Sequence, residues 1–324
     1  MKWPTQVVRI VVGPSFWSLD AGDGLGDKCV FISDQGEAAV YQGTNPADPT
    51  AWRLANVYPM AETMHKNAHM RAGGDLLIAT KEGFLPISSA VSKDVAALPL
   101  SAVSLPIEPT WRAYIADRPG KWVVGKWTAK NMAVIGFPKD ANGQSACFAI
   151  NLQTGGWARF TGWDVRCALE FDGKLYFGTS DGRVLNAEQS GYDDGLPYSC
   201  LYVGLHERAG NTTQEKVANM ARGTFRYSTD FKYKIGFAFD YHYTLGAYPS
   251  VPPETVTDLW DVGKWDVAKW DGRGVSKIKT EWQSTFGRGF VVSPIVQITM
   301  GTNTIPDVEL ISIDMLYEKG AIVT

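Results

Sequence analysis

The sequence predicts an all-β protein made of short antiparallel strands. Aromatic residues make up 12% of the 324 residues and glycine occurs 33 times, which is typical of strands joined by tight turns. Because sheets that recur every few tens of residues are what a β-propeller requires, we expect propeller-like blades, whether or not the propeller closes within this chain, and then a β-rich platform domain. Helices are expected only at 62–70 and 214–222.

Three hairpins carry the repeated pattern. Each has two apolar segments on either side of a small polar turn, and the turn ends at Gly36, Gly83 or Gly182. Glycine can adopt the positive φ angle that a tight hairpin needs. The hairpins are predicted at residues 29–42 (CVFISDQGEAAVYQ), 75–87 (DLLIATKEGFLPI) and 174–185 (KLYFGTSDGRVL).

A fourth unit is longer than these hairpins. Residues 122–137 (WVVGKWTAKNMAVIGF) and 147–160 (CFAINLQTGGWARF) each contain a strand, a polar turn and a second strand. We expect the two segments to form one four-stranded antiparallel sheet. Trp52 and Trp157 would close the outer strands of their blades.

The strand pattern changes near residue 195. Residues 223–243 (GTFRYSTDFKYKIGFAFDYHY) alternate polar and aromatic side chains over much of their length, which predicts a sheet with one packed face and one wet face. The turn-forming segment 192–197 (YDDGLP) marks a boundary. We therefore predict a propeller-like domain at 1–195 and a β-rich platform or interface domain at 196–324.

Charge and apolar runs exclude two classes of partner. The chain has 31 Lys and Arg residues against 34 Asp and Glu, a net charge of −3, so no broad positive field is available to hold a phosphate backbone tightly. The apolar run at 7–12 is too short for a signal peptide, and no later run is long enough to span a bilayer. We expect synthesis in the host cytoplasm and no membrane partner.

The four cysteines do not form a metal or redox motif. Cys29, Cys147, Cys167 and Cys200 lie far apart, and no Cys-x-x-Cys pair occurs. We interpret them as small buried apolar residues. Whether any two of them pair in the folded chain stays open.

Two histidines have the spacing of a helical zinc pair. The first predicted helix would place His65 and His69 on one face. Lys66, however, stands where a metalloprotease helix carries its glutamate base, and no ligand-like residues neighbour His206 or His242. We expect surface or turn histidines and no metal site.

The acidic loop LDAGDGLGDK does not match a known ion site. Asp20, Asp23 and Asp27 lack the alternating ligands and the late glutamate of an EF-hand loop, so we expect a solvated turn. Its glycines match neither a dinucleotide fingerprint nor a phosphate loop. No Gly-x-Ser-x-Gly elbow or catalytic carboxylate pair stands out elsewhere. The sequence therefore predicts a protein that is not an enzyme and has no cofactor.

The most unusual segment is LWDVGKWDVAKWDG, in which a Trp-Asp step recurs every five residues. A spacing of five gives neither one helix face nor one strand face, so Trp260, Trp265 and Trp270 cannot all point into a single local core. We predict that these tryptophans lie in an interface between subunits, where tryptophan is a favoured residue. Anchoring of an irregular loop, or stacking on sugars or bases, stays open.

Five segments, taken in order, resemble bacteriophage structural proteins of the podoviral tail-nozzle or packaged-DNA-stabilisation type. They run from about residue 29 to the C-terminus, and they are SDQGEAAVYQGTNPADPTAWRLANVYPM, GGDLLIATKEGFLPIS, FDGKLYFGTSDGRVLNAE, LWDVGKWDVAKWDG and ISIDMLYEKGAIV. The resemblance implies a β-propeller joined to a platform, assembled as a hexameric ring around the DNA exit channel. It also implies contacts with adaptor or tube proteins on one side and with fibres or a tip on the other.

These observations favour a structural protein of a tailed-phage virion, located in the tail or neck, whose ring conducts DNA without binding it specifically. A near-neutral chain suits this role because a conduit must release the phosphates that pass through it. One alternative is a carbohydrate-binding or depolymerase module of a tail fibre, which would use the Trp-rich segment to stack on sugars. Another is a cellular propeller that serves as an interaction scaffold.

Overall fold

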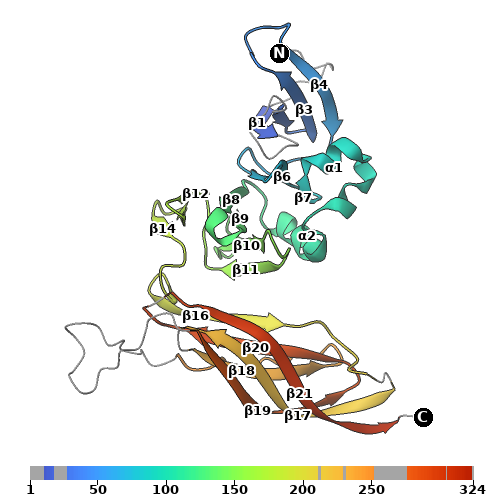
Figure 1. Cartoon of the computed structure of the whole chain (residues 1–324), viewed down its shortest axis with the longest axis vertical. Coiled ribbons are helices and arrows are strands. Elements are labelled where there is room, and N and C mark those ends of the chain that lie inside the picture. Colours follow the sequence, from blue (N-terminus) through green and yellow to red (C-terminus); the bar gives the residue numbers. More distant parts are fainter. Residues whose placement is uncertain are drawn as a thin grey trace, which may run out of the picture. The chain divides into compact units, whose positions relative to one another are not determined.

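The structure is a computed structural model that describes residues 11–17, 28–210, 213–228, 231–251, 276–303 and 305–322. Antiparallel strands predominate over helices, so the predicted all-β class is confirmed (Figure 1). The chain divides into two compact units, Met1–Ala187 and Glu188–Thr324. This division lies a few residues before Gly195, where the sequence analysis placed the domain boundary.

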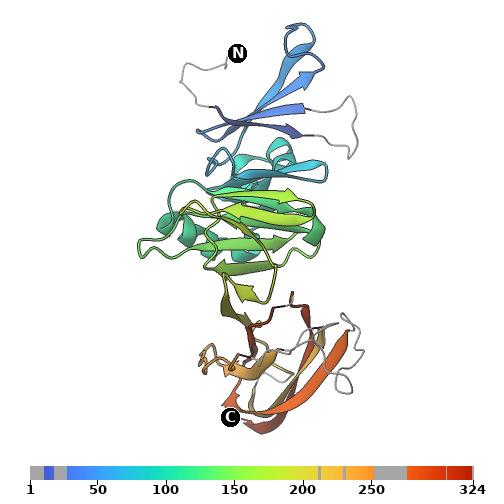
Figure 2. The ribbon, with the colours of Figure 1, turned by 90° about the vertical axis from the view of Figure 1, so that its left-hand side faces the viewer.

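The first unit contains four antiparallel sheets, each formed by strands that follow one another in the chain (Figures 1 and 2). The first sheet comprises β1 (Val11–Trp17), β2 (Lys28–Ser33), β3 (Glu37–Gly43) and β4 (Trp52–Pro59). The second comprises β5 (His69–Ala72), β6 (Asp75–Thr80) and β7 (Gly83–Pro86). The third comprises β8 (Val123–Trp127), β9 (Met132–Gly136), β10 (Ala146–Asn151) and β11 (Trp157–Thr161). The fourth comprises β12 (Cys167–Phe171), β13 (Lys174–Gly178) and β14 (Val184–Asn186).

The three predicted hairpins are confirmed. They correspond to the antiparallel pairs β2–β3, β6–β7 and β13–β14. Gly36, Gly83 and Gly182 have φ angles of 75°, 144° and 85°, which only glycine adopts without strain. At Gly36 a Cβ atom would also lie 2.4 Å from the carbonyl oxygen of Met60, so the turn excludes larger residues twice over.

The predicted four-stranded sheet is confirmed as β11-β10-β9-β8. Its first turn contains a 3-10 segment, Thr128–Lys130, and reverses at Asn131, which has a left-handed φ of 51°. The turn between β10 and β11 reverses at Gly155, with a φ of 71°. Trp52 and Trp157 begin the outer strands β4 and β11, as expected for residues that close a sheet.

Both predicted helices are wrong. Residues 62–68 form a turn beside β6, where Met64 donates its backbone N–H to the carbonyl of Ala79 (3.0 Å), and His69 and Met70 begin strand β5. Residues 214–222 belong to the long strand β17 (Gln214–Tyr227), whose ladder has a bulge between Ala218 and Met220. The bulge shifts the side-chain alternation, so the buried Ala218 and Ala221 are spaced three apart, as in a helix.

The helices of the first unit lie between its second and third sheets. They are α1 (Ile87–Ser92), three 3-10 segments (Val95–Ala97, Pro99–Ser101 and Leu105–Ile107) and α2 (Glu108–Asp117). Helix α2 buries Trp111, whose indole N–H donates to the carbonyl of Thr80 (3.1 Å). The sequence analysis missed α2, although Pro109 at its start is a helix-initiation signal.

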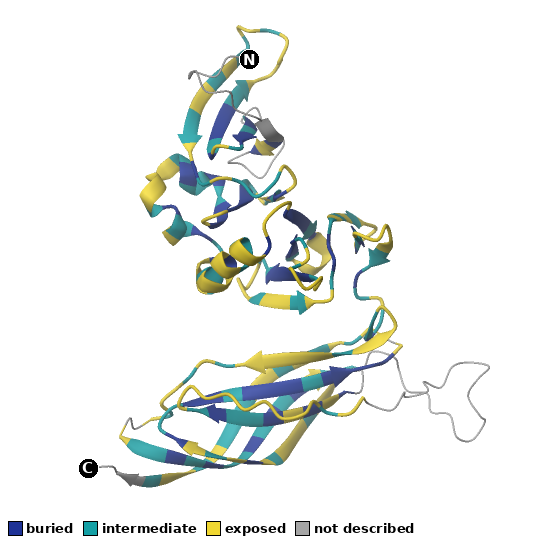
Figure 3. Cartoon of the chain, turned by 180° about the vertical axis from the view of Figure 1, so that it is seen from behind, coloured by how far each residue is buried: buried dark blue, intermediate teal, exposed yellow. Residues whose placement is uncertain are grey.

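Aromatic side chains from α2 and the third sheet form the largest core of the first unit. Trp111 contacts Trp122 edge to face, with ring centroids 5.1 Å apart, and Phe137 contacts Phe148 at 4.7 Å. Tyr114 packs against both phenylalanines. Figure 3 shows the buried residues concentrated on the strands of each sheet. Such aromatic burial stabilises the unit.

The second unit is a two-layer β-sandwich. One sheet has the order β15 (Tyr192–Asp193), β16 (Leu196–Val203), β20 (Val292–Met300) and β18 (Lys232–Phe239). The other has the order β19 (Lys277–Gly289), β17 and β21 (Val308–Ile322). Both sheets contribute to one core, which includes Phe225, Tyr233 and Val296. The predicted strands at 223–243 are therefore the end of β17 and the whole of β18, one in each layer.

Candidate interaction surface

The three tryptophans predicted to form an interface, Trp260, Trp265 and Trp270, lie outside the described residues. The same holds for the acidic loop with Asp20, Asp23 and Asp27, and for its glycines. The interface prediction for these tryptophans therefore stays a prediction. Other surfaces of the described chain are considered below.

The four histidines do not converge on a metal site. His65 and His69 lie on a turn and on strand β5, and burial lowers the pKa of both. In the second unit, His206 stacks on Tyr241 with ring centroids 4.5 Å apart, and His242 hydrogen-bonds the carbonyl of Asp240 (2.8 Å). Among the residues that the structure describes, no group of three potential ligands could hold a metal ion.

The cysteines are thiols, and no disulfide joins them. Cys29 and Cys147 are buried, as expected. Cys167 and Cys200 are exposed, so their predicted burial is wrong. Cys167 lies on β12, an outer strand of its sheet, and Cys200 lies on β16, which β15 covers only at Leu196 and Pro197.

Two buried charged residues in the first unit, Arg118 and Asp164, make several polar contacts that hold neighbouring segments together. Arg118 donates to the carbonyls of Pro138 (3.1 Å) and Gln144 (2.7 Å) and pairs with Asp140 (3.2 Å). Asp164 accepts from Arg166 (2.9 Å) and from Ser180. Burial alone would raise the pKa of Asp164, but these hydrogen bonds and nearby cations lower it overall. Neither group is available for chemistry.

A row of large apolar side chains lies on the outer face of β19. Ile278, Trp282 and Phe286 are all exposed, Phe286 at 95% of its surface. Between them on the same face stand Thr280 and Ser284, because successive strand residues alternate between faces. We call Ile278, Trp282 and Phe286 the β19 row. Several large apolar side chains exposed on one sheet face make that face a candidate interaction surface.

The middle of the β19 row is held in place by charged neighbours on the adjacent strands. The Arg222 guanidinium on β17 lies over the Trp282 ring, 4.8 Å from its centroid. Arg222 in turn pairs with Asp314 on β21 (2.8 Å). On the same face, Met220 is paired in register with both Ser284 and Leu316. The Trp282 ring therefore packs against a guanidinium that is itself held by a carboxylate.

The β19 row was missed by the sequence analysis. Its signal is a period of two, since Ile278, Thr280, Trp282, Ser284 and Phe286 occupy every second position. That pattern indicates a strand whose outer face is half apolar. The interface prediction was instead based on the Trp-Asp repeat a few residues earlier, with Trp260, Trp265 and Trp270.

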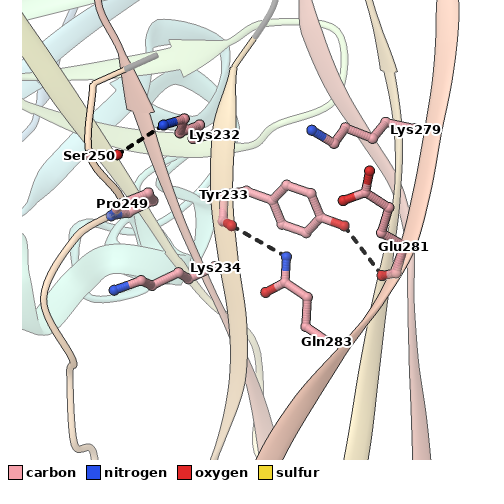
Figure 4. A pocket seen from close by; sticks show the side chains of 8 residues that line it. All are labelled: Lys232, Tyr233, Lys234, Pro249, Ser250, Lys279, Glu281 and Gln283. Atoms are coloured by element: carbon pink, nitrogen blue, oxygen red, sulfur yellow. Dashed lines mark hydrogen bonds between the residues drawn. The ribbon is translucent and has the colours of Figure 1, made fainter. Parts of the chain in front are cut away.

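A pocket of about 320 Å³ opens between β18 and β19 (Figure 4). Its charged lining comprises three lysines and one carboxylate: Lys232, Lys234, Lys279 and Glu281. Lys232 donates to the Ser250 hydroxyl (3.0 Å) and Lys234 to the carbonyl of Ala247 (2.6 Å). The remaining lining residues are Tyr233, Pro249, Ser250 and Gln283. The lining therefore has excess positive charge.

Gln283 closes the outer edge of β18 inside this pocket. Its side-chain amide accepts from the backbone N–H of Ile235 (3.2 Å) and donates to the carbonyl of Tyr233 (3.3 Å). The Tyr233 hydroxyl crosses to the carbonyl of Glu281 on β19 (3.3 Å). Figure 4 shows the bonds from Tyr233 to Gln283 and to Glu281, which bridge the two strands. The pocket therefore lies at the junction of the two layers, where side chains of β18 and β19 hydrogen-bond the backbone of the opposite strand.

Comparison with known proteins adds no relative. The sequence matches no protein-family model and no curated protein. Within the described ranges, no helix has the length and apolar character needed to cross a membrane.

Proposed function

We propose that the chain is a structural subunit of a tailed-phage virion that assembles into a ring in the tail nozzle or the head-to-tail neck, through which DNA passes. The β19 row is the observation that best supports an assembling protein. Tryptophan, phenylalanine and arginine are enriched in protein interfaces, and tryptophan and arginine are frequent hot spots. Trp282, Phe286 and Arg222 stand together on one exposed sheet face.

The build of the chain agrees with this proposal. The four successive antiparallel sheets of the first unit would be the blades of the propeller, and the β-sandwich of the second unit would be the platform. A net charge of −3 suits a lumen that conducts DNA without retaining it. Six copies would form the ring, with adaptor or tube proteins and fibres or a tip as its neighbours, and no catalytic group or cofactor would be needed.

Electron microscopy of the purified full-length chain tests the proposal. The wild-type chain should form closed rings of six copies, and antibody labelling should mark the tail or neck of the virion. The double variant Trp282→Ala/Phe286→Ser should lose the rings, because each hot-spot residue contributes on the order of 2 kcal/mol or more per contact. The control Thr280→Ala/Ser284→Ala changes the same face but not the row, so it should still form rings. A chain that stays monomeric and is absent from tails would overturn the proposal.

The β19 row also supports a second candidate, a carbohydrate-binding module of a tail fibre. Trp282 and Phe286 are four residues apart on one strand, about 14 Å in an extended chain. Exposed aromatic rings on a flat sheet can stack on sugar faces. Binding of the wild-type chain to host polysaccharide, lost in Trp282→Ala/Phe286→Ser without any change in oligomeric state, would favour this candidate over the ring.

A further inference from the structure

Strand β16 (Leu196–Val203) lies at the margin of its sheet with most of its outer edge uncovered. The two-residue strand β15 pairs only with Leu196 and Pro197. From Tyr198 to Val203, no strand within the described ranges is paired with that edge, while β20 pairs with the other. The backbone groups on the outer edge therefore lack strand partners over about six residues.

The register identifies which residues direct their backbone groups outward. Gly204 donates its N–H to the carbonyl of Pro294 on β20 (2.8 Å), in register with the β16–β20 ladder. In an antiparallel ladder, hydrogen-bonded pairs alternate with non-hydrogen-bonded pairs. The even-numbered residues of β16 therefore bond to β20. Ser199, Leu201 and Val203 present their N–H and C=O groups to the outer edge.

Within the part of the chain that the structure describes, the exposed edge lacks the usual protection against pairing. Natural proteins protect such edges with charged side chains, bulges or covering segments. Residues 196–205 (LPYSCLYVGL) contain no charged residue, and seven of the eight residues of β16 are exposed (Figure 3). Leu205, just beyond the strand, is 85% exposed. Only Pro197 is an edge-protecting residue, and β15 already covers it.

The opposite margin of the same sheet is protected. In β18, the odd-numbered residues direct their backbone groups away from β20, and Gln283 binds those of Tyr233 and Ile235. Lys232 and Lys234 add charge along that strand. One margin of the sheet is therefore closed to a further strand, and the other is open.

We infer that β16 pairs antiparallel with β16 of a second copy of this chain, around a two-fold axis at Cys200. An open strand edge requires a strand as its partner, and an uncharged strand meets no like-charge repulsion when it pairs with itself. In a two-fold contact every favourable pair also occurs twice. The β16 strand of a second copy can therefore pair with this edge, and no other segment is needed.

The register restricts how the two copies can align. Outward-directed residues must face each other, so a two-fold axis at Cys200 pairs Ser199 with Leu201 of the second copy through backbone hydrogen bonds. The two Cys200 residues then form a non-hydrogen-bonded pair with Cα atoms about 4.5 Å apart. Tyr198 lies across from Tyr202, an aromatic pair worth roughly 0.2 to 1 kcal/mol.

This contact goes beyond the proposed ring. Neighbouring subunits of a six-membered cyclic ring are related by a six-fold rotation and not by a two-fold axis, so the β16 pair is not the contact between neighbours in such a ring. Electron microscopy of virions and cross-linking of the purified chain report on the two separately, and either can fail alone.

Cross-linking of the full-length chain tests the inference. In a Cys167→Ser background, which removes the other exposed thiol, a mild added oxidant should join two chains through Cys200, and Cys200→Ser should abolish that cross-link. Sedimentation should show a dimer that Leu201→Lys/Val203→Lys weakens at least tenfold, because four ammonium groups would meet at the seam. Leu169→Lys is the matched control: this leucine is exposed on β12 in the first unit, and the dimer should persist.

Three results would overturn the inference. They are a monomer at all concentrations, a dimer that tolerates the two lysines, and a cross-link that survives Cys200→Ser. Efficient cross-linking through Leu201→Cys in a Cys200→Ser chain, with none through Cys200, would overturn the register. Circular dichroism of each variant should match the wild-type chain, since the substituted side chains are exposed.

Discussion

Replacing Gln283 by leucine should remove two hydrogen bonds between β18 and β19 and lower the stability of the second unit. Leucine approximates the volume of glutamine but cannot bond the N–H of Ile235 or the carbonyl of Tyr233. Both backbone groups belong to buried residues, at 7% and 6% exposure. An unmet buried polar group costs about 1 to 3 kcal/mol.

The size of the effect follows from the geometry of the two bonds. At 3.2 and 3.3 Å they lie at the long end of the normal range, and water can enter the adjacent pocket, so each group should cost near the lower limit. The total loss is then about 2 kcal/mol of unfolding free energy. For a unit of this size, that loss corresponds to a Tm decrease of roughly 7 °C.

Urea denaturation and amide exchange measure this prediction. Gln283→Leu should lower the urea midpoint without changing the slope m, and the Ile235 amide should exchange faster than in the wild-type chain. Thr280→Val, on the exposed face of the same strand, is the control and should stay within about 0.5 kcal/mol. An unchanged midpoint together with unchanged protection of Ile235 would refute the capping role of Gln283.

Buried charge and titration give the remaining predictions. Arg118→Met should lower the unfolding free energy measured by urea denaturation by about 3 kcal/mol, because Asp140 loses a buried partner. Arg118→Lys should lose less of this free energy. A loss below about 1 kcal/mol in Arg118→Met would contradict the prediction. Burial lowers the pKa of His69 and, with nearby lysines, that of His65, so the unfolded chain binds more protons in acid and Tm should fall as the pH drops through about 6.5. His69→Gln should flatten that slope, and a Tm that rises on acidification would show the sign to be wrong. Burial raises the pKa of Tyr198 to about 12, so the folded chain retains a proton that the unfolded chain releases near pH 10, and stability should fall between these values. Tyr198→Phe should remove that part of the alkaline loss, and an alkaline unfolding curve identical to that of the wild-type chain would contradict it.

Local turn chemistry explains which parts of the fold could be predicted from sequence. The hairpins at Gly36, Gly83 and Gly182 depend on residues that stand next to each other in the chain, so their signal is contained in a few positions. The helix prediction at 214–222 failed because the bulge at Ala218 gives a strand the spacing of a helix. That bulge is defined by pairing with β19 and β21, which lie far away in the sequence.

The candidate surfaces depend on sheet order, which no local pattern contains. Trp282 is alternately spaced with its neighbours, and the sequence could have indicated its strand face. Whether that face is exposed depends on which strands flank it and on whether a further layer covers it. The same holds for β16, since its apolar sequence suits a buried strand as well as an exposed edge.

The two margins of the β15-β16-β20-β18 sheet connect stability with association. At β18, the side chain of Gln283 occupies the backbone groups that another strand would use, and removing it should both destabilise the unit and create a second open edge. At β16, no side chain or charge among the described residues has this role, so Leu201→Lys should prevent pairing at little cost to stability. The two substitutions act in opposite directions on association because one opens an edge and the other protects one. We expect Gln283→Leu to lower stability and promote association, and Leu201→Lys to leave stability unchanged and not promote association. That result would show that the exposed strand edges control self-association of this chain.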